Sequence, residues 1–155
     1  MNHASPKNLS QEGDVELLES EISHKESLLR TISELDRTFS EDRGWDMGDF
    51  FAEDARLMFP LMEDIVSREA IRETFVSTVS KYTTDSWNPK REIIHIYEKR
   101  AYTYGSFIEI RTPLDGGPTE KVYGRLHEIW QLSSDGKWEI IRFMAGRYAE
   151  TEFLE

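Results

Sequence analysis

The sequence predicts an α+β fold, with helices packed on one face of a curved, mostly antiparallel sheet. Apolar residues recur at helical spacing in the first half of the chain, whereas residues 91–148 alternate like a series of strands. The dipeptide Asp135-Gly136 and the segment 116–118 (Gly-Gly-Pro) supply the tight turn and the loop that an antiparallel meander requires. Helices gathered early and strands gathered late are typical of α+β architecture.

Composition indicates one globular domain. The chain has 155 residues, enough for a single core, and 38% of them are hydrophobic. Residues 1–13 are polar and include Pro6 and Gly13, so we expect a disordered tail there. The single domain is expected over residues 14–155, with its core in residues 25–148.

Charge and residue types argue against several classes of function. The 30 acidic and 19 basic side chains give a net charge of −11, the opposite of the basic surface that nucleic acids and anionic membranes attract. Without cysteine, the chain can form no disulfide, thiolate nucleophile or cysteine zinc site. The first residues lack the apolar core of a secretory signal, and no run reaches about 20 apolar residues. We therefore expect a soluble, cytoplasmic protein.

Helices are expected in three places. Residues 14–42 carry apolar side chains at three- and four-residue spacing, and Gly44 follows as a stop signal. The periodicity is clearest in residues 25–43, and residues 14–24 either continue that helix or form a separate short one. Residues 45–52 predict a second, short helix. Ser67 can cap a third helix, whose apolar stripe comprises Ile71, Phe75, Val79 and Tyr82.

Strands are expected first at residues 55–59, where Pro60 ends the strand, and then throughout the last third of the chain. After a loop at residues 83–89, residues 91–112 predict a hairpin that turns at Lys99-Arg100. Residues 121–132 and 137–148 predict a second hairpin across the turn at residues 133–136.

Several motifs resemble the nuclear transport factor 2-like, or SnoaL-like, superfamily. The segment DFFAEDARLMFP is similar to the family pattern FxxDAxxxxP, with Phe51, Asp54, Ala55 and Pro60 in place. SREAIRETF resembles a G-R-x-A-I-R-x-x-F helix start, although Ser67 replaces the usual glycine. AYTYGSF and GRLHEIWQLSSDGKWEI resemble the paired late strands of the family. The likeness covers residues 25–148.

The resemblance implies a cone-shaped, cystatin-like sheet with a central pocket, usually in a homodimer. Relatives include ketosteroid isomerases, scytalone dehydratases, limonene epoxide hydrolases and polyketide cyclases, while others only bind ligands or partners, so the fold does not decide the function. At two places this chain departs from the residues of these relatives, which narrows the choice of activity. The isomerases place their base aspartate where this chain has Phe59, and AYTYGSF lacks the Arg and Asp of the epoxide hydrolases.

Glu128 is the main candidate for a catalytic group. It shares a strand face with Leu126 and Trp130, whereas polar residues occupy the other face, so its face is predicted to be buried. A buried carboxyl group loses hydration, and its pKa rises unless a cation compensates, which suits a general acid or base. The position also resembles that of a carboxylic acid in the isomerase pocket. The alternative is a structural ion pair with an arginine.

The turn at residues 133–136 decides whether Arg142 is that arginine. A two-residue turn at Asp135-Gly136 sets Glu128 opposite Phe143 and directs Ile141, Phe143 and Ala145 inward. A three-residue turn instead sets Glu128 opposite Arg142. The preference of Asp-Gly for two-residue turns favours the first register.

An aromatic cluster offers possible hydrogen-bond donors. If Lys99-Arg100 is a two-residue turn, His95 lies opposite Tyr104 and Tyr97 opposite Tyr102. His95 and Tyr104 could then stabilise a developing oxyanion, although cross-strand packing or a dimer face explains the cluster as well.

An apolar cavity is expected to bind the substrate, with core packing as the alternative role for each of its residues: Trp45, Phe59, Phe107, Trp130 and Phe143. His127 and Glu128 point to opposite faces of their strand and no HExxH spacing occurs, so we expect no metal site.

The sequence thus predicts a cofactor-free enzyme that moves protons in an isomerisation, cyclisation, dehydration or hydrolysis of a small apolar molecule. We expect a homodimer and no nucleic-acid or membrane partner. The rival interpretation is a non-catalytic ligand carrier or dimeric interaction module of the same fold, in which residues 14–24 could serve as a docking segment.

Overall fold

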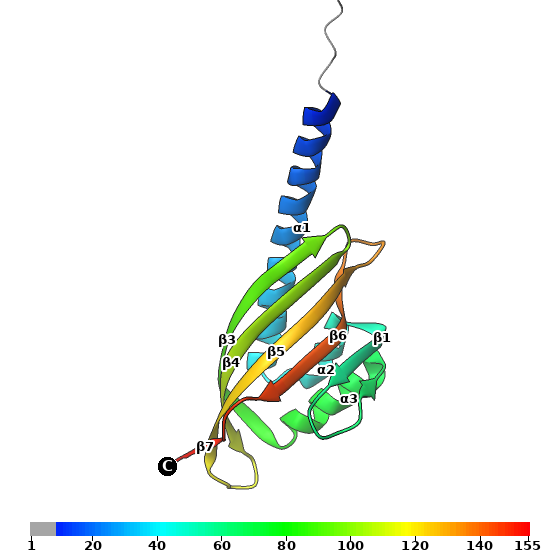
Figure 1. Cartoon of the computed structure of the whole chain (residues 1–155). Coiled ribbons are helices and arrows are strands. Elements are labelled where there is room, and N and C mark those ends of the chain that lie inside the picture. The colour runs from blue at the N-terminus through cyan, green and yellow to red at the C-terminus, as the bar shows by residue number, and fades with distance from the viewer. Residues whose placement is uncertain (1–8) are drawn as a thin grey trace, which may run out of the picture.

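The protein combines helices and one seven-stranded sheet (Figure 1). The computed structural model describes residues 9–155 and, apart from residues 9–18, 21 and 94, their side chains. The elements in chain order are α1 (Leu9–Ser40), α2 (Gly44–Met47), the 3-10 helix η1 (Gly48–Phe50), β1 (Phe51–Met58), β2 (Ile65–Val66), α3 (Arg68–Val79), β3 (Tyr82–Tyr97), β4 (Arg100–Pro113), β5 (Thr119–Leu132), β6 (Trp138–Arg147) and β7 (Glu152–Leu154). Within the described residues, none of these helices is long and apolar enough to cross a membrane.

The sheet has the strand order β2-β1-β6-β5-β4-β3, with β7 added to β5. Every neighbouring pair is antiparallel except β1 and β6, which run parallel. Figure 1 shows the long strands β3–β6 curving, with α1 along one face and α2 and α3 near one end. This arrangement confirms the predicted α+β fold with helices on one face of a curved sheet.

The hydrophobic core lies between α1 and this face of the sheet. Its buried side chains include Leu28 and Leu35 from α1, Phe51 from β1 and Ile71 from α3. The sheet contributes Trp130, Trp138 and Ile140. Burial of these large apolar groups is what holds the helices against the strands.

Helix α1 is one continuous helix, so residues 14–24 continue it. It begins at Leu9, and residues 9–13 are therefore helical, whereas we expected them in the disordered tail; residues 1–8 lie outside the described residues. The helix ends at Ser40, before the predicted Gly44. Asp42 ends it by adopting a positive φ of 56°, and its carboxylate accepts a hydrogen bond from the Thr84 backbone N–H at 3.0 Å.

The predicted second helix is shorter than expected. The helical turns end at Phe50, and Phe51 and Ala52 belong to β1, because Phe51 pairs with Ile140 of β6 and is fully buried. Helix α3 begins as predicted, with the Ser67 hydroxyl accepting a hydrogen bond from the Ala70 N–H at 3.2 Å. Ser67 has a φ of 94°, a conformation that favours the glycine usual at this family position.

The loop predicted at residues 83–89 is wrong, because β3 begins at Tyr82 and pairs with β4 along this segment. Pro89 is tolerated since β3 is the edge strand. The hairpin turns at Glu98-Lys99, one residue earlier than predicted, and pairs Tyr97 with Arg100. A register shift then sets His95 opposite Tyr102, so the predicted pairing of His95 with Tyr104 is also wrong.

The predicted pairing of Glu128 with Phe143 is confirmed, but a β-bulge and not a two-residue turn produces it. The loop between β5 and β6 follows the three-residue register, with Leu132 opposite Trp138. A β-bulge at Ile129 and Trp130 then shifts the pairing of β5 with β6 by one residue, which sets Glu128 opposite Phe143. Because of that bulge, Ile140 rather than the predicted Ile141 enters the core.

Candidate functional site

Glu128 is buried, as the sequence predicted, with 0% of its side chain exposed. Its partner is Arg91 of β3, whose Nε donates to Glu128 Oε1 at 2.6 Å. Arg142, the partner considered from the sequence, instead directs Nη1 to the backbone carbonyl of Ile141. Burial raises the pKa of Glu128, while the charge of Arg91 opposes that rise.

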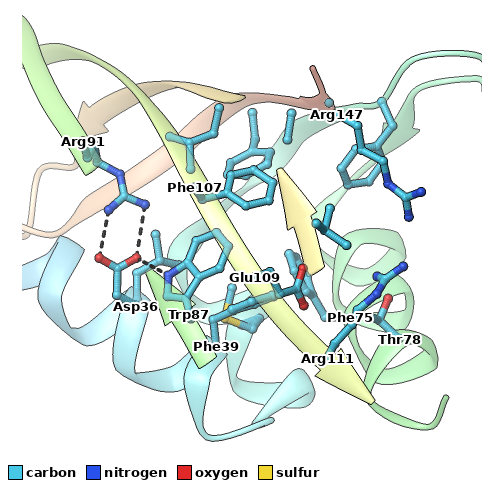
Figure 2. Close-up of a pocket in the computed structure, with 18 of the residues that line it drawn as sticks. Asp36, Phe39, Phe75, Thr78, Trp87, Arg91, Phe107, Glu109, Arg111 and Arg147 are labelled. Atoms are coloured by element: carbon cyan, nitrogen blue, oxygen red, sulfur yellow. Dashed lines mark hydrogen bonds and ion pairs between the residues drawn. The ribbon is translucent and has the colours of Figure 1, made fainter. Parts of the chain in front are cut away.

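Arg91 also binds a second carboxylate, Asp36 of α1. Its Nη1 donates to Asp36 Oδ2 at 2.9 Å and its Nη2 to Oδ1 at 3.2 Å. The indole N–H of Trp87 donates to the same Oδ1 at 3.0 Å (Figure 2). One guanidinium therefore serves two carboxylates and links α1, β3 and β5.

A cavity of about 290 Å³ lies beside this cluster, between the helices and the inner face of the sheet. Its apolar wall includes Phe39, Phe51, Phe59, Phe75, Trp87, Val122, Leu126 and Phe143. Asp36 and Arg91 line one side of it, but Glu128 is not among its lining residues. The cluster thus fixes the Arg91 guanidinium at the cavity wall, with Glu128 behind it.

A different carboxyl group, that of Glu109 on β4, lines this cavity. Only 8% of Glu109 is exposed, and Figure 2 shows its carboxylate directed into the cavity. Burial raises the pKa of Glu109, and the positive charges of Arg111 and Arg147 oppose the rise. A buried carboxyl group with a raised pKa can act as an acid or a base.

Two arginines line the same end of the cavity as Glu109. Arg111 comes from β4 and Arg147 from the end of β6, and Figure 2 shows their guanidinium groups approaching one another from opposite walls. Arg111 Nε donates to Glu120 Oε2 at 2.8 Å, and its guanidinium lies 4.0 Å from the ring centre of Tyr82. This side of the cavity is therefore polar and carries positive charge, while the middle is apolar.

Three of the five predicted cavity residues line this cavity: Phe59, Phe107 and Phe143. Trp130 does not, because it is fully buried in the core and donates from Nε1 to Thr103 Oγ1 at 3.1 Å. Trp45 is 62% exposed and packs under the guanidinium of Arg72.

His95 and Tyr104 lie on the outer face of the sheet, away from Glu128. Tyr104 is opposite His127, whereas its neighbour Thr103 is opposite Glu128, so strand alternation separates the two faces. Tyr104 is 43% exposed and His95 stacks on Tyr97. The structure therefore does not bring these two candidates together with the buried carboxylates.

Sequence reasoning missed Glu109, Arg111 and Arg147. In the segment FIEIRT, the isoleucines alternate with Glu109 and Arg111, so hydrophobicity alone favours burying the wrong face. The available signal was that Phe107, Glu109 and Arg111 share one face of β4, and Phe107 was already a cavity candidate.

No protein-family model and no curated protein matches the chain. Solved structures do. A ketosteroid isomerase-like protein from Erwinia carotovora atroseptica is 14% identical, with a TM-score of 0.71 over 80% of this chain and 95% of that one. An NTF2-like protein with a cystatin-like fold, from Novosphingobium aromaticivorans, is 12% identical, with a TM-score of 0.62 over 93% and 92%. ActVI-ORFA from Streptomyces coelicolor is 10% identical, with a TM-score of 0.65 over 80% and 96%.

At these identities the likeness shows the fold. The chain has the cystatin-like, NTF2-like α+β fold, which confirms the resemblance read from its motifs. Within the described residues, no group of three or more histidine, aspartate or glutamate side chains is placed to hold a metal ion.

Proposed function

We propose that the protein is a cofactor-free enzyme that transfers protons on a small, largely apolar molecule bound in the 290 Å³ cavity. Glu109 is its acid and base. The observation that carries the proposal is a carboxyl group, 8% exposed, in the wall of a cavity whose middle is apolar. Burial raises the pKa of Glu109, which favours its acting as an acid as well as a base.

A carboxyl group that gives and takes a proton can catalyse an isomerisation or a dehydration without a cofactor. Ionised Glu109 takes a proton from a carbon next to a carbonyl group, and the electron pair left on that carbon moves onto the carbonyl oxygen. The positive charge of Arg111 or Arg147 stabilises the negative charge that develops there. Neutral Glu109 then returns the proton to another position, which isomerises the molecule, or to a leaving hydroxyl group, which dehydrates it.

Two further observations support this class of reaction. The fold is shared with a ketosteroid isomerase-like protein, although that likeness alone assigns no activity. The cavity volume of 290 Å³ is close to the lower limit of ligand sites, which run from about 300 to 1,000 Å³. In this proposal Glu128, the candidate chosen from the sequence, holds Arg91 in place and does not touch the substrate.

Proton exchange tests the proposal without knowledge of the substrate. A panel of cyclic ketones and hydroxy ketones is incubated with the protein in D2O, and deuterium uptake beside the carbonyl group is followed by NMR. We expect Glu109→Gln to lower the exchange rate by about 10²–10⁴-fold, the usual contribution of a positioned acid or base.

The matched control is Glu150→Gln, which removes the same charge from an exposed loop. Exchange that survives in Glu109→Gln as well as in Glu150→Gln would refute the role of Glu109. Binding of panel compounds with no exchange above the protein-free rate would instead identify a ligand-binding protein.

A further inference from the structure

Two guanidinium groups, those of Arg111 and Arg147, line the polar side of the cavity beside Glu109. Arg111 has a partner, because its Nε donates to Glu120 Oε2 at 2.8 Å. For Arg147 the structure gives no ion pair among the described residues, and the carboxyl group that its charge influences is that of Glu109. An anionic group entering the cavity would meet both guanidinium groups (Figure 2).

Arg111 is held in place before any ligand arrives. Its guanidinium stacks 4.0 Å from the ring centre of Tyr82, and the side chains of Arg111 and Glu120 are 14% and 15% exposed. Because only Nε is bonded to Glu120, the two Nη groups remain for a ligand. A planar guanidinium fixed in this way matches the two oxygens of a carboxylate.

The middle of the cavity favours a flat ring. Trp87 lies 4.6 Å from the ring centre of Phe39 and 4.8 Å from that of Phe107, and all three line the cavity. The indole N–H of Trp87 is already bonded to Asp36, so the aromatic wall offers apolar surface rather than a hydrogen-bond donor. Stacked or tilted aromatic contacts stabilise a bound ring.

We propose that the ligand of this cavity is a small aromatic or alicyclic carboxylic acid. Its carboxylate lies between Arg111 and Arg147, and its ring lies against Trp87 and Phe107. This inference rests on the proposed function, since it names the class of molecule on which Glu109 acts. The 290 Å³ cavity limits the ligand to a few rings.

The charges around Glu109 predict that binding of a carboxylate raises the pKa of this residue. Arg111 and Arg147 lower the pKa of Glu109, whereas Asp42 and Glu120 raise it, and burial raises it most. A bound carboxylate uses part of the N–H donors of the two guanidinium groups, leaving others for the oxyanion, and adds a negative charge beside Glu109. Ionised Glu109 becomes less favourable, so binding raises its pKa, and the ionised fraction is the base that starts the reaction.

The test compares two probes by isothermal titration calorimetry. They are 2-naphthoate and 2-naphthalenemethanol, which share a ring system and differ in charge. We expect the carboxylate to bind about tenfold more tightly or better, because hydrogen bonds to a charged acceptor are roughly twice as strong as neutral ones. Arg147→Gln should reduce this preference and leave binding of the alcohol unchanged, because only Arg111 then remains to bind the carboxylate, and Arg147→Lys should retain more of it.

Arg100→Gln is the control, since Arg100 is exposed at the start of β4 and its removal changes the net charge equally. Equal binding of the two probes by the wild type, or an unchanged preference in Arg147→Gln, would overturn the inference. The proposed function fails separately, through loss of Glu109-dependent exchange. Exchange without any preference for the carboxylate would leave that function standing and this inference refuted.

Discussion

Arg91 is the residue on which the buried charges depend, because it is the cation that contacts both Asp36 and Glu128. Replacing it by Met keeps the apolar stem but leaves two carboxylates without their cation. We expect Arg91→Met to lower the free energy of unfolding by about 3–5 kcal/mol, the usual cost of breaking a buried ion pair. Urea denaturation followed by circular dichroism measures this change.

The control for that measurement is Arg56→Gln, which breaks the exposed pair with Asp64. An exposed pair contributes less than about 1 kcal/mol, so this variant should unfold almost like the wild type. Equal effects of the two substitutions would contradict the structural role of Arg91.

Glu128→Gln should behave differently from Arg91→Met, because Arg91 keeps its two hydrogen bonds to Asp36. Burial raises the pKa of Glu128, so the folded state holds the proton more tightly than the unfolded chain. The wild type then loses stability as the pH rises above the unfolded carboxyl pKa of about 4.3, while the variant does not.

The variant should therefore match the wild type in acid and become the more stable of the two toward neutral pH. Thermal melting of both proteins across a pH series measures the difference. A variant that is less stable at neutral pH and recovers in acid would mean that Arg91 lowers the pKa of Glu128 below its ordinary value.

Gly124 of β5 lies opposite Phe107 of β4, which lines the cavity. A methyl group on Gly124 would overlap the Phe107 ring, so the ring must move in Gly124→Ala. We expect a loss of about 1–3 kcal/mol in the free energy of unfolding, typical of overpacking, together with weaker 2-naphthoate binding. Gly117→Ala in the exposed β4–β5 loop is the control, and equal losses in both variants would contradict this role of Gly124.

The elements show which parts of the structure local patterns can predict. Helix α3 was predictable because its cap, Ser67, acts within the same segment. Strand β3 was missed at residues 83–89 because a proline is compatible with a strand only at a sheet edge, and the edge position depends on the whole strand order. The bulge that sets Glu128 opposite Phe143 also depends on packing between strands, and the Asp-Gly turn gave no sign of it.

At the scale of the whole molecule, the fold was predictable and the cavity only partly so. The order of helices and strands and the family motifs led to the observed architecture, and the burial of Glu128 followed from its apolar neighbours. The sequence did not predict Arg91 as the ion-pair partner of Glu128, nor Glu109 as the acid of the cavity. Both lie on strands whose inner face carries charged residues, and only the curvature of the sheet places that face around a cavity.

Helix α1 extends beyond the sheet at its N-terminal end (Figure 1), which predicts that this part adds little to stability. His24 and Ser27 contact Trp138 of the sheet, whereas Ile22 is 58% exposed. Deleting residues 1–22 should change the free energy of unfolding by less than about 1 kcal/mol, because the described residues at this end of α1 extend beyond the sheet. Deleting residues 1–29 should cost more, since Leu28 is fully buried; a large loss in the shorter deletion, measured in urea, would contradict this.

The most direct measurement is the titration of Glu109 by NMR in protein labelled with 13C at the glutamate carboxyl groups. Comparison with Glu109→Gln assigns its resonance. We predict that it titrates above the ordinary carboxyl range, because burial raises the pKa of Glu109, and that saturating 2-naphthoate moves it further up. A resonance that titrates with the exposed glutamates and ignores the ligand would contradict both the acid-base role of Glu109 and the binding of a carboxylate beside it.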